Sequence, residues 1–247
     1  VTGHLMAGLA AGLVVHAVDR LLFHRGEAAE RREIAASLEP GVRAVLAAER
    51  AGARRRRAET SGNPAEWISH VKDRPLVPAT AYVHPQASVI GRVVLGENVH
   101  IAAGSSVRAD EGTPFFIGPN SNIQDGVVIH ALKQKFVRVG SEDWAVYVGR
   151  NVSMAHDALV HGPCYVGDDT FIGFKAVVHD SVLGSHCFVG HGSIVVGVEV
   201  PDGKFVPHGS SIHRPAKLDH MPAVDPTQMH FKEDGEHVNR GLAAAYR

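Results

Sequence analysis

Residues 145–178 read AVYVGRNVSMAHDALVHGPCYVGDDTFIGFKAVV, and an apolar residue recurs at every sixth position of this stretch. The repeat extends towards both ends of the chain, with an insertion before Ile117, a longer excursion at 130–147 and small slips in register after Val178. Its apolar positions are Val83, Val89, Leu95, Ile101, Val107, Ile117, Ile123, Ile129, Val148, Met154, Val160, Val166, Ile172, Val178, Leu183, Val189, Val195, Val200, Val206 and Ile212. A fixed period of this kind indicates one repeated structural unit.

A six-residue period fits a triangular solenoid, in which each hexapeptide forms one short strand and one corner and three hexapeptides form a coil. Sandwiches and barrels instead space their strands by about 8–12 residues without a fixed period. Gly follows many of the apolar positions, as expected at corners that need a positive φ or a close backbone approach. We therefore predict a mainly-β, left-handed parallel β-helix over residues 66–224. A C-terminal α-helix over residues 225–247 follows, with Pro226 near its start.

Residues 1–65 lack the repeat and predict a helical N-terminal extension. Residues 27–57 are rich in Ala, Glu and Arg and have high helix propensity, which Pro40 and Gly41 should divide into two helices. Residues 60–64 (TSGNP) have the composition of a linker.

The apolar run at residues 5–16 (LMAGLAAGLVVH) is shorter than the roughly 20 residues of a spanning helix, and no basic stretch precedes it. A packed or oligomerising helix is favoured, and membrane association through residues 5–23 is the alternative. The four arginines at 54–57 fit a solvated helix end or a contact with anionic lipid, so residues 1–65 could meet a membrane or a partner protein. The first residue is Val1 rather than Met, which fits a missing upstream piece or an alternative start codon. A cytoplasmic location is favoured.

The composition narrows the function classes. The formal net charge is −1 over 247 residues, so no global field favours nucleic acid. Cys164 and Cys187 form no CxxC motif and are expected to be buried as small hydrophobic residues. The 17 His are an unusual number, and imidazole is a common neutral ligand of transition metals.

The repeat gives each His a place on the prism. If the excursion at 130–147 is looped out, Ile129 and Val160 lie three hexapeptides apart, on the same face in neighbouring coils. His130 and His161, which follow them, should then stack about 5 Å apart and point outward. His156 falls on another face, so it should not reach an ion bound by the other two His of its own chain.

A neighbouring prism related by a threefold axis could supply the missing His, which gives three sites per trimer. The same count places Arg108 one coil below this pair of His and His179 one coil above it, where His179 could support the site. The alternative for each His alone is an ordinary core or surface residue. We assign that role to His84, His100, His186 and His191.

Two stretches resemble γ-class carbonic anhydrases and the related N-terminal domain of a carboxysome scaffold protein. They are SVRADEGTPFFIGPNSNIQDGVVIHAL (106–132) and AVYVGRNVSMAHDALVHGPCYVGDDTFIGF (145–174). The spaced R-x-D-E, N-x-Q-D-G-x-x-x-H and H-x-x-x-x-H elements are specific, and the resemblance covers about residues 73–247. Residues 1–65 match no family that we recognise.

The resemblance implies a homotrimer with zinc at each subunit boundary, and iron or cobalt as alternative metals. The implied ligands are His130 and His161 from one subunit and His156 from the next. Three neutral imidazoles leave an open position, where zinc lowers the pKa of a bound water. The hydroxide so formed attacks CO₂ to give bicarbonate.

The resemblance also implies roles for other residues. Arg108 and Asp110 would form an ion pair across the boundary. Gln124 would hydrogen-bond the metal-bound water, with Asp125 supporting the local network. The residues implied for proton transfer and for the substrate side are Glu111 and Asn239.

One position departs from the family pattern. Archetypal active members carry a second glutamate three residues after the first His ligand, as a relay of protons to solvent, and this chain has Lys133 there. This departure leaves a catalytically weak or inactive metal-binding scaffold subunit as the alternative. A hexapeptide-repeat acyltransferase is a more distant one, since such enzymes need no metal triad. The intact Glu111 favours the enzyme.

Overall fold

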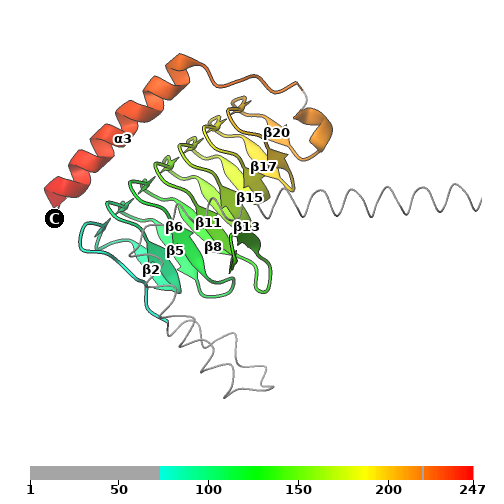
Figure 1. Cartoon of the computed structure of the whole chain (residues 1–247). Helices are drawn as coiled ribbons and strands as arrows, with labels where there is room; N and C mark the ends of the chain where they lie inside the picture. The colour runs from blue at the N-terminus through cyan, green and yellow to red at the C-terminus, as the bar shows by residue number, and fades with distance from the viewer. Residues whose placement is uncertain (1–72, 219, 247) are drawn as a thin grey trace, which may run out of the picture. The chain divides into compact units, whose positions relative to one another are not determined.

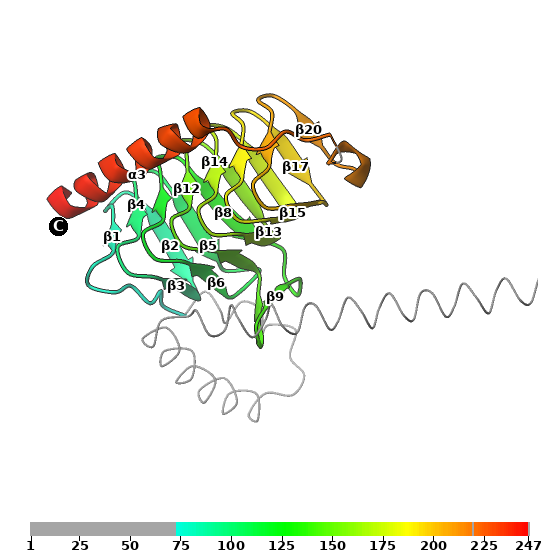
Figure 2. The same cartoon turned by 45° about the horizontal axis from the view of Figure 1, so that its top comes forward.

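The computed structural model describes residues 73–218 and 220–246, which form a parallel β-helix followed by one long α-helix. Short strands from successive coils stack on one another along the axis of the solenoid (Figures 1 and 2). The predicted mainly-β solenoid with a C-terminal helix is confirmed.

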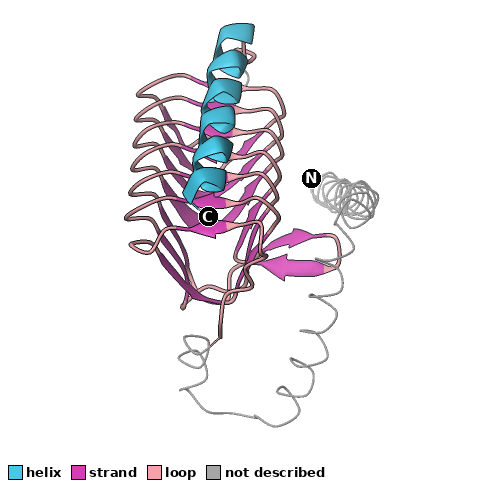
Figure 3. Ribbon diagram, turned by 90° about the vertical axis from the view of Figure 1, so that its left-hand side faces the viewer, coloured by secondary structure: helices cyan, strands magenta, loops and turns pink. Residues whose placement is uncertain are grey.

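The first face of the prism is a seven-stranded parallel sheet with one strand from each coil. Its strands, in spatial order, are β1 (Tyr82–Val83), β4 (His100–Ile101), β7 (Asn122–Ile123), β12 (Ser153–Met154), β14 (Phe171–Ile172), β16 (Phe188–Val189) and β19 (Phe205–Val206). This face is the one that carries the C-terminal helix (Figure 3).

An eleven-stranded sheet forms the other two faces. The second face contains β2 (Ser88–Gly91), β5 (Ser106–Ala109), β8 (Val128–Ala131), the start of β13 (Leu159–Val166) and of β15 (Val177–Leu183), β17 (Ile194–Val196) and β20 (Ser211–Ile212). The third face contains β3 (Val93–Leu95), β6 (Phe115–Ile117), β11 (Val146–Val148), the ends of β13 and β15, and β18 (Glu199–Val200). Strands β13 and β15 therefore pass from one face to the next.

The register of the strands matches the hexapeptide count. Val148 pairs with Val166, 18 residues on, whereas Ile129 pairs with Val160 across the excursion. In the excursion, β9 (Val137–Val139) pairs with β10 (Glu142–Trp144). The slip after Val178 has its origin at 161–164, where the register between β13 and β15 shifts.

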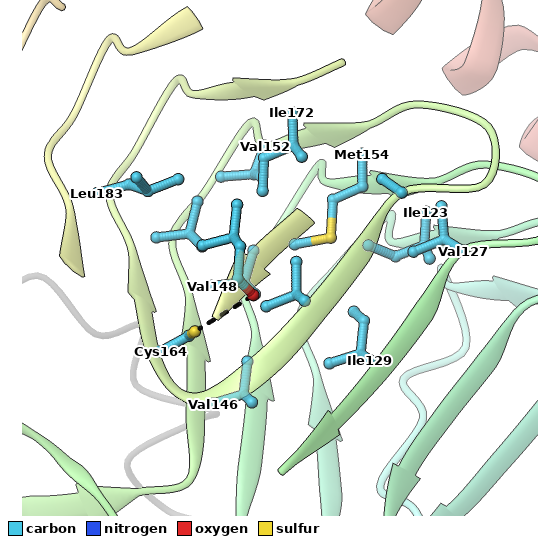
Figure 4. Packing of buried hydrophobic residues seen from close by; sticks show 14 of the residues in the cluster. Ile123, Val127, Ile129, Val146, Val148, Val152, Met154, Cys164, Ile172 and Leu183 are labelled. Carbon is cyan, nitrogen blue, oxygen red and sulfur yellow. Dashed lines mark hydrogen bonds between the residues drawn. The ribbon is translucent and has the colours of Figure 1, made fainter. Parts of the chain in front are cut away.

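The repeated apolar residues fill the interior of the prism (Figure 4). Each fully buried side chain of this size contributes about 1.5–3 kcal/mol by leaving water. Both cysteines belong to this core, as expected, and both are free thiols. Burial raises the pKa of the Cys187 thiol to about 11, so this group stays protonated at neutral pH.

Positive φ angles and close contacts occur at different corner positions. One corner column has a positive φ in successive coils at Asn98, Asn120, Asn151, Asp169 and His186. Asn and Asp tolerate this conformation, and their side chains also bond along the column, as Asn151 Nδ2 does to Asp169 Oδ1 at 3.0 Å. Glycines that follow the inward residues serve close approach instead. A Cβ on Gly118 would lie 2.4 Å from the oxygen of Gly149.

The C-terminal helix α3 (Pro226–Tyr246) begins with a reciprocal cap. The backbone N–H of Gln228 donates to Asp225 Oδ1, and the side chain of Gln228 accepts from the backbone N–H of Asp225, both at 2.9 Å. Pro226 follows as the first helical residue, where its missing N–H costs nothing. The helix then packs along β1, β4, β7 and β12 (Figure 3).

A buried ion pair joins this helix to the solenoid. The Lys232 side chain is 2% exposed, and its Nζ lies 2.6 Å from Glu236 Oε1 and 3.7 Å from Asp169 Oδ1. Burial raises the pKa of Glu236, and the Lys232 ammonium acts in the opposite direction. Each charge therefore depends on the other to remain inside.

The predictions for residues 1–65, including the two helices and the linker, lie outside the described residues. The described strands extend from Tyr82 to Ile212, and the division of the chain at residues 65 and 224 stays a prediction. No helix in the described part of the chain is long and apolar enough to cross a membrane.

We expect Glu236→Leu to lower the free energy of unfolding by about 3 kcal/mol, because it leaves the buried Lys232 charge without its nearest partner. Lys232→Met/Glu236→Leu should recover most of this loss, since it removes both charges. Urea unfolding followed by circular dichroism at one protein concentration measures both. If the double variant is as unstable as the single one, the loss of stability comes from altered packing and not from an unpaired buried charge.

Candidate metal centre

The second face carries a column of outward-pointing imidazoles. His130 in β8 pairs in register with His161 in β13, which pairs in turn with His179 in β15. Ile129 and Val160 before them are fully buried, so the side chains that follow point away from the core. The predicted stacking of His130 on His161 is confirmed, and so is the position of His179 one coil above.

A chain of polar contacts extends from this column. The rings of His130 and His161 have centroids 5.3 Å apart, and His130 Nε2 lies 3.1 Å from Asp110 Oδ1. Asp110 Oδ2 lies 3.5 Å from a guanidinium nitrogen of Arg108 in the same chain. Asp110 thus orients both a His and an Arg side chain. The pairing of Arg108 and Asp110 between subunits stays a prediction.

His161 is held in its neutral form by its surroundings. Burial lowers its pKa most, the neighbouring His130 and His179 lower it further, and Glu111 acts in the opposite direction. Glu111 follows Asp110 in the chain, and the next residue, Gly112, donates its backbone N–H to the carbonyl oxygen of Ala131, which follows His130. The Nε2 atom of His161 is the ring nitrogen that faces His130, 3.4 Å from His130 Nδ1, whereas its Nδ1 is buried. A neutral imidazole can bind a metal through such a nitrogen.

His156 lies two residues after β12, at a corner of the prism. Its Nδ1 is 3.2 Å from Asp125 Oδ2, and its ring stacks on Phe174 at 5.5 Å with the planes 4° apart. The side chain of His156 is 53% exposed, so these two contacts are what orient it. A carboxylate at Nδ1 leaves Nε2 as the nitrogen that can bind a metal.

The chain therefore presents two separate parts of a site. We call Arg108, Asp110, Glu111, His130 and His161 the column half-site. We call Asp125, His156 and Phe174 the corner half-site. Asn239 lies in α3, where its Nδ2 donates to the carbonyl oxygen of Gly235 at 2.8 Å. Within residues 73–218 and 220–246, no three His, Cys, Asp or Glu side chains are grouped so that they could hold a metal ion.

Gln124 is buried and belongs to a hydrogen-bonded chain of side chains. Its Nε2 donates to Asn122 Oδ1 at 3.1 Å, and Asn122 Nδ2 donates to Ser153 Oγ at 2.6 Å. The amide of Gln124 is therefore fixed with its nitrogen towards Asn122. Its predicted contact with a metal-bound water stays a prediction.

Sequence reasoning missed one residue near the predicted site. Phe174 lies 18 residues after His156, one coil above it, and this spacing is a signal that could have found it. His100, which was assigned an ordinary structural or surface role, is buried with its ring 6.4 Å from that of Tyr246 in α3. No spacing in the sequence could predict this contact, because it joins the first coils to the C-terminal helix.

The column half-site fits zinc in one measurable respect. Two nitrogens on the same tetrahedral zinc, each about 2.0–2.1 Å from it, lie about 3.3 Å apart. His130 Nδ1 and His161 Nε2 lie 3.4 Å apart. The separation of these two nitrogens is therefore compatible with one bound ion.

Comparison with solved structures supports the fold. The chain superposes on a hexapeptide transferase family protein from Anaplasma phagocytophilum with a TM-score of 0.56 at 23% identity, covering 70% of this chain and 93% of the other. A putative acetyltransferase from Bacillus cereus gives 0.57 at 20% identity, with 71% and 92% covered. At these identities the likeness shows the solenoid alone. No family model matches the chain.

Curated relatives are more specific. The chain is 42% identical over 197 residues to "Carbonic anhydrase" of Methanosarcina thermophila, which is 75% of this chain and 80% of that protein. It is 43% identical to the carboxysome assembly protein CcmM of a Nostoc species over 76% of this chain, although it spans only 34% of that protein. "Gamma carbonic anhydrase 2, mitochondrial" of Arabidopsis thaliana is 35% identical over 53% of this chain and 46% of its own length.

These features define a hexapeptide-repeat β-helix protein with a divided His site. The chain belongs to the γ-class carbonic anhydrase family, as its sequence motifs predicted. A metal cofactor is expected of that family, and the roles of the individual residues stay predictions.

We expect Asp125→Ala to weaken zinc binding by about tenfold or more, because His156 loses the carboxylate that orients it. Asp125→Asn is the matched control, since its amide oxygen can still accept from Nδ1–H. Competition with a chromophoric chelator measures the Kd of each variant. Equal affinity in Asp125→Ala and the unmodified protein would show that Asp125 does not support the metal site.

Proposed function

We propose that this protein catalyses the reversible hydration of CO₂ to bicarbonate, with zinc between subunits of a homotrimer. The ligands would be His130 and His161 of one subunit and His156 of the next. The observation that carries the proposal is the division of the site. One chain stacks two of the His on one face and holds the third at a separate corner, in a family where metal-dependent enzymes are expected.

The surroundings of the corner half-site support a subunit boundary there. Phe174, which stacks on His156, is itself an exposed apolar side chain. Helix α3 exposes a further set of large apolar side chains, namely Phe231, Val238, Leu242 and Tyr246. The spacing of these four residues by seven, four and four places them along one side of the helix. Contiguous exposed apolar surface of this kind marks a contact with another protein surface.

Bound zinc would supply a Lewis acid and an activated water. The chain's own residues then have defined tasks. Gln124, fixed by Asn122, would present its amide oxygen to a hydrogen-bond donor at the metal. Glu111, which follows Asp110 beside the column half-site, would accept the proton that must leave after each turnover. Asn239 would border the substrate.

A catalytically weak or inactive scaffold subunit is the second candidate. The similarity to carboxysome assembly proteins favours it, and so does Lys133 at the position where a relay glutamate is expected. Such a subunit would bind the metal and form the trimer but would hydrate CO₂ slowly or not at all. Metal analysis combined with stopped-flow CO₂ hydration therefore separates the two candidates. An acyltransferase would bind acyl-CoA and need no zinc.

The division of the ligands predicts complementation between subunits. His156→Ala chains and His130→Ala chains, each unable to build a complete site alone, should form some intact sites when mixed in one trimer. The intact boundaries draw His130 and His161 from the first variant and His156 from the second. Zinc content of the remixed trimers measures this, and content no higher than in either variant alone would rule out shared ligands.

Proton export should limit turnover, because Lys133 stands where archetypal family members carry a glutamate that relays protons to solvent. Imidazole buffer should then raise kcat severalfold and leave kcat/KM nearly unchanged. Lys133→Glu should raise kcat at low buffer concentration, whereas Glu111→Ala should lower it severalfold.

Lys135→Glu is the matched control for this series, because it changes the charge of the same segment two residues further on. Stopped-flow CO₂ hydration over a range of buffer concentrations measures all variants. If kcat does not depend on buffer concentration and Lys133→Glu does not change it, the slow step lies at the metal site and not in proton export.

A further inference from the structure

The corner that carries His156 continues above it as a column of stacked rings. Strands β12, β14, β16 and β19 pair in register, so the residues two places after their inward side chains lie above one another. These residues are His156, Phe174, His191 and His208. The centroids of Phe174 and His191 are 4.5 Å apart, and those of His191 and His208 are 4.7 Å apart. The proposed mechanism gives the two upper imidazoles no task.

Main-chain donors fix the tautomers of these two imidazoles. The backbone N–H of Phe174 donates to His191 Nδ1 at 3.0 Å, and the backbone N–H of His191 donates to His208 Nδ1 at 2.8 Å. A backbone N–H can only donate, so each Nδ1 is unprotonated and each neutral ring carries its proton on Nε2. His156 Nδ1 instead faces the carboxylate of Asp125, which accepts its proton in a hydrogen bond. Of the three imidazoles in this column, only His156 therefore has the lone pair on Nε2 that a metal needs.

The position of the His191 ring is defined closely by its surroundings. A Cβ on Gly173 would lie 2.7 Å from His191 Nδ1, so the corner leaves room for this ring only because a glycine precedes Phe174. Aromatic side chains from β14, β16 and α3 meet the ring at centroid distances of 6.1–6.3 Å, and they are Phe171, Phe188 and Phe231. Burial lowers the pKa of His191 and His208 lowers it further, so the ring remains neutral.

The ring of Phe174 is held between two imidazoles. His156 lies on one side of it, at 5.5 Å with the planes 4° apart, and His191 lies on the other, with the planes 22° apart. Phe174 is an exposed side chain, so a ring with a neighbour on one face only would be free to turn towards solvent. The contact with His191 restricts that movement. Because the half-exposed His156 rests on Phe174, its direction depends on His191 as well.

We propose that His191 is a positioning residue for the metal centre. Its ring, anchored by the backbone N–H of Phe174, holds the Phe174 ring flat against His156 and so directs His156 Nε2 towards the ion. The inference rests on the proposed function for the role of His156 as a ligand. The stacking and the tautomers rest only on contacts within this chain.

The test separates the ring of His191 from its hydrogen-bond acceptor in the full-length protein. His191→Ala removes both and should weaken zinc binding about fivefold, the effect of losing one stacked aromatic pair. His191→Phe keeps a flat ring and should stay within about twofold of the unmodified protein. His191→Asn keeps an acceptor near the position of Nδ1 but offers Phe174 no ring, so it should bind zinc as weakly as His191→Ala. Competition with a chromophoric chelator measures the Kd of each variant.

His84→Ala is the matched control for these substitutions. The Nδ1 atom of His84 likewise accepts a backbone N–H, from Gln86 at 3.1 Å, but the residue follows β1 in the first coil, outside the column of rings. Its removal should leave the affinity for zinc unchanged. Unchanged affinity in His191→Ala would overturn the proposal, and so would an equal loss in His191→Ala and His191→Phe.

A readout in the metal-free protein keeps the inference distinct from the proposed function. The ring current of Phe174 shifts the NMR signals of the His156 ring protons, and this shift should shrink in His191→Ala and persist in His191→Phe. The same result in a protein that binds no zinc would refute the proposed function and leave the positioning of His156 standing. An unchanged His156 spectrum in His191→Ala would refute the positioning role.

Discussion

Each coil of this β-helix must place its inward side chains on those of the coil below, and this stacking governs the rest of the structure. Ile123, Met154 and Ile172 lie in register on one face although insertions separate them unequally in sequence. Extra residues are expelled into the excursion after His130, since an out-of-phase coil would turn its apolar side chains towards water. The outward residues inherit the same register. Columns of functional side chains are thus a by-product of core packing.

A convex prism has a consequence for metal binding. Outward side chains on one flat face diverge from those on the next, so a single chain can align His130 with His161 but cannot wrap three His around an ion. In the proposed trimer, a second prism would complete the enclosure of the ion. The contacts of His156 fit this arrangement. Asp125 and Phe174 orient an exposed ring that no other candidate ligands join in the described part of the chain.

The sequence predicts what depends on the repeat and misses what depends on the C-terminal helix. Counting in sixes gives the inward positions and the stacking of His130 on His161, because both follow from local periodicity. The contacts of Lys232 with Asp169 and of His100 with Tyr246 join segments far apart in the chain, and no period links them. The sequence could not say why Gly is needed at each corner. A Gly required by close packing, as at Gly118, looks the same in a sequence as a Gly required by a positive φ.

The two half-sites differ in how firmly the chain holds them. The column half-site sits on long strands whose side chains are fixed by neighbours above and below, and burial keeps His161 neutral without help from another subunit. The corner half-site depends on a half-exposed ring just after β12, a strand on which α3 packs. Helix α3 is tied to the solenoid by Lys232, whose Nζ lies 3.7 Å from Asp169 Oδ1. A loss of that tie would loosen the helix beside the corner, while the register of the coils would remain. The corner therefore depends on the C-terminal helix as well as on the repeat.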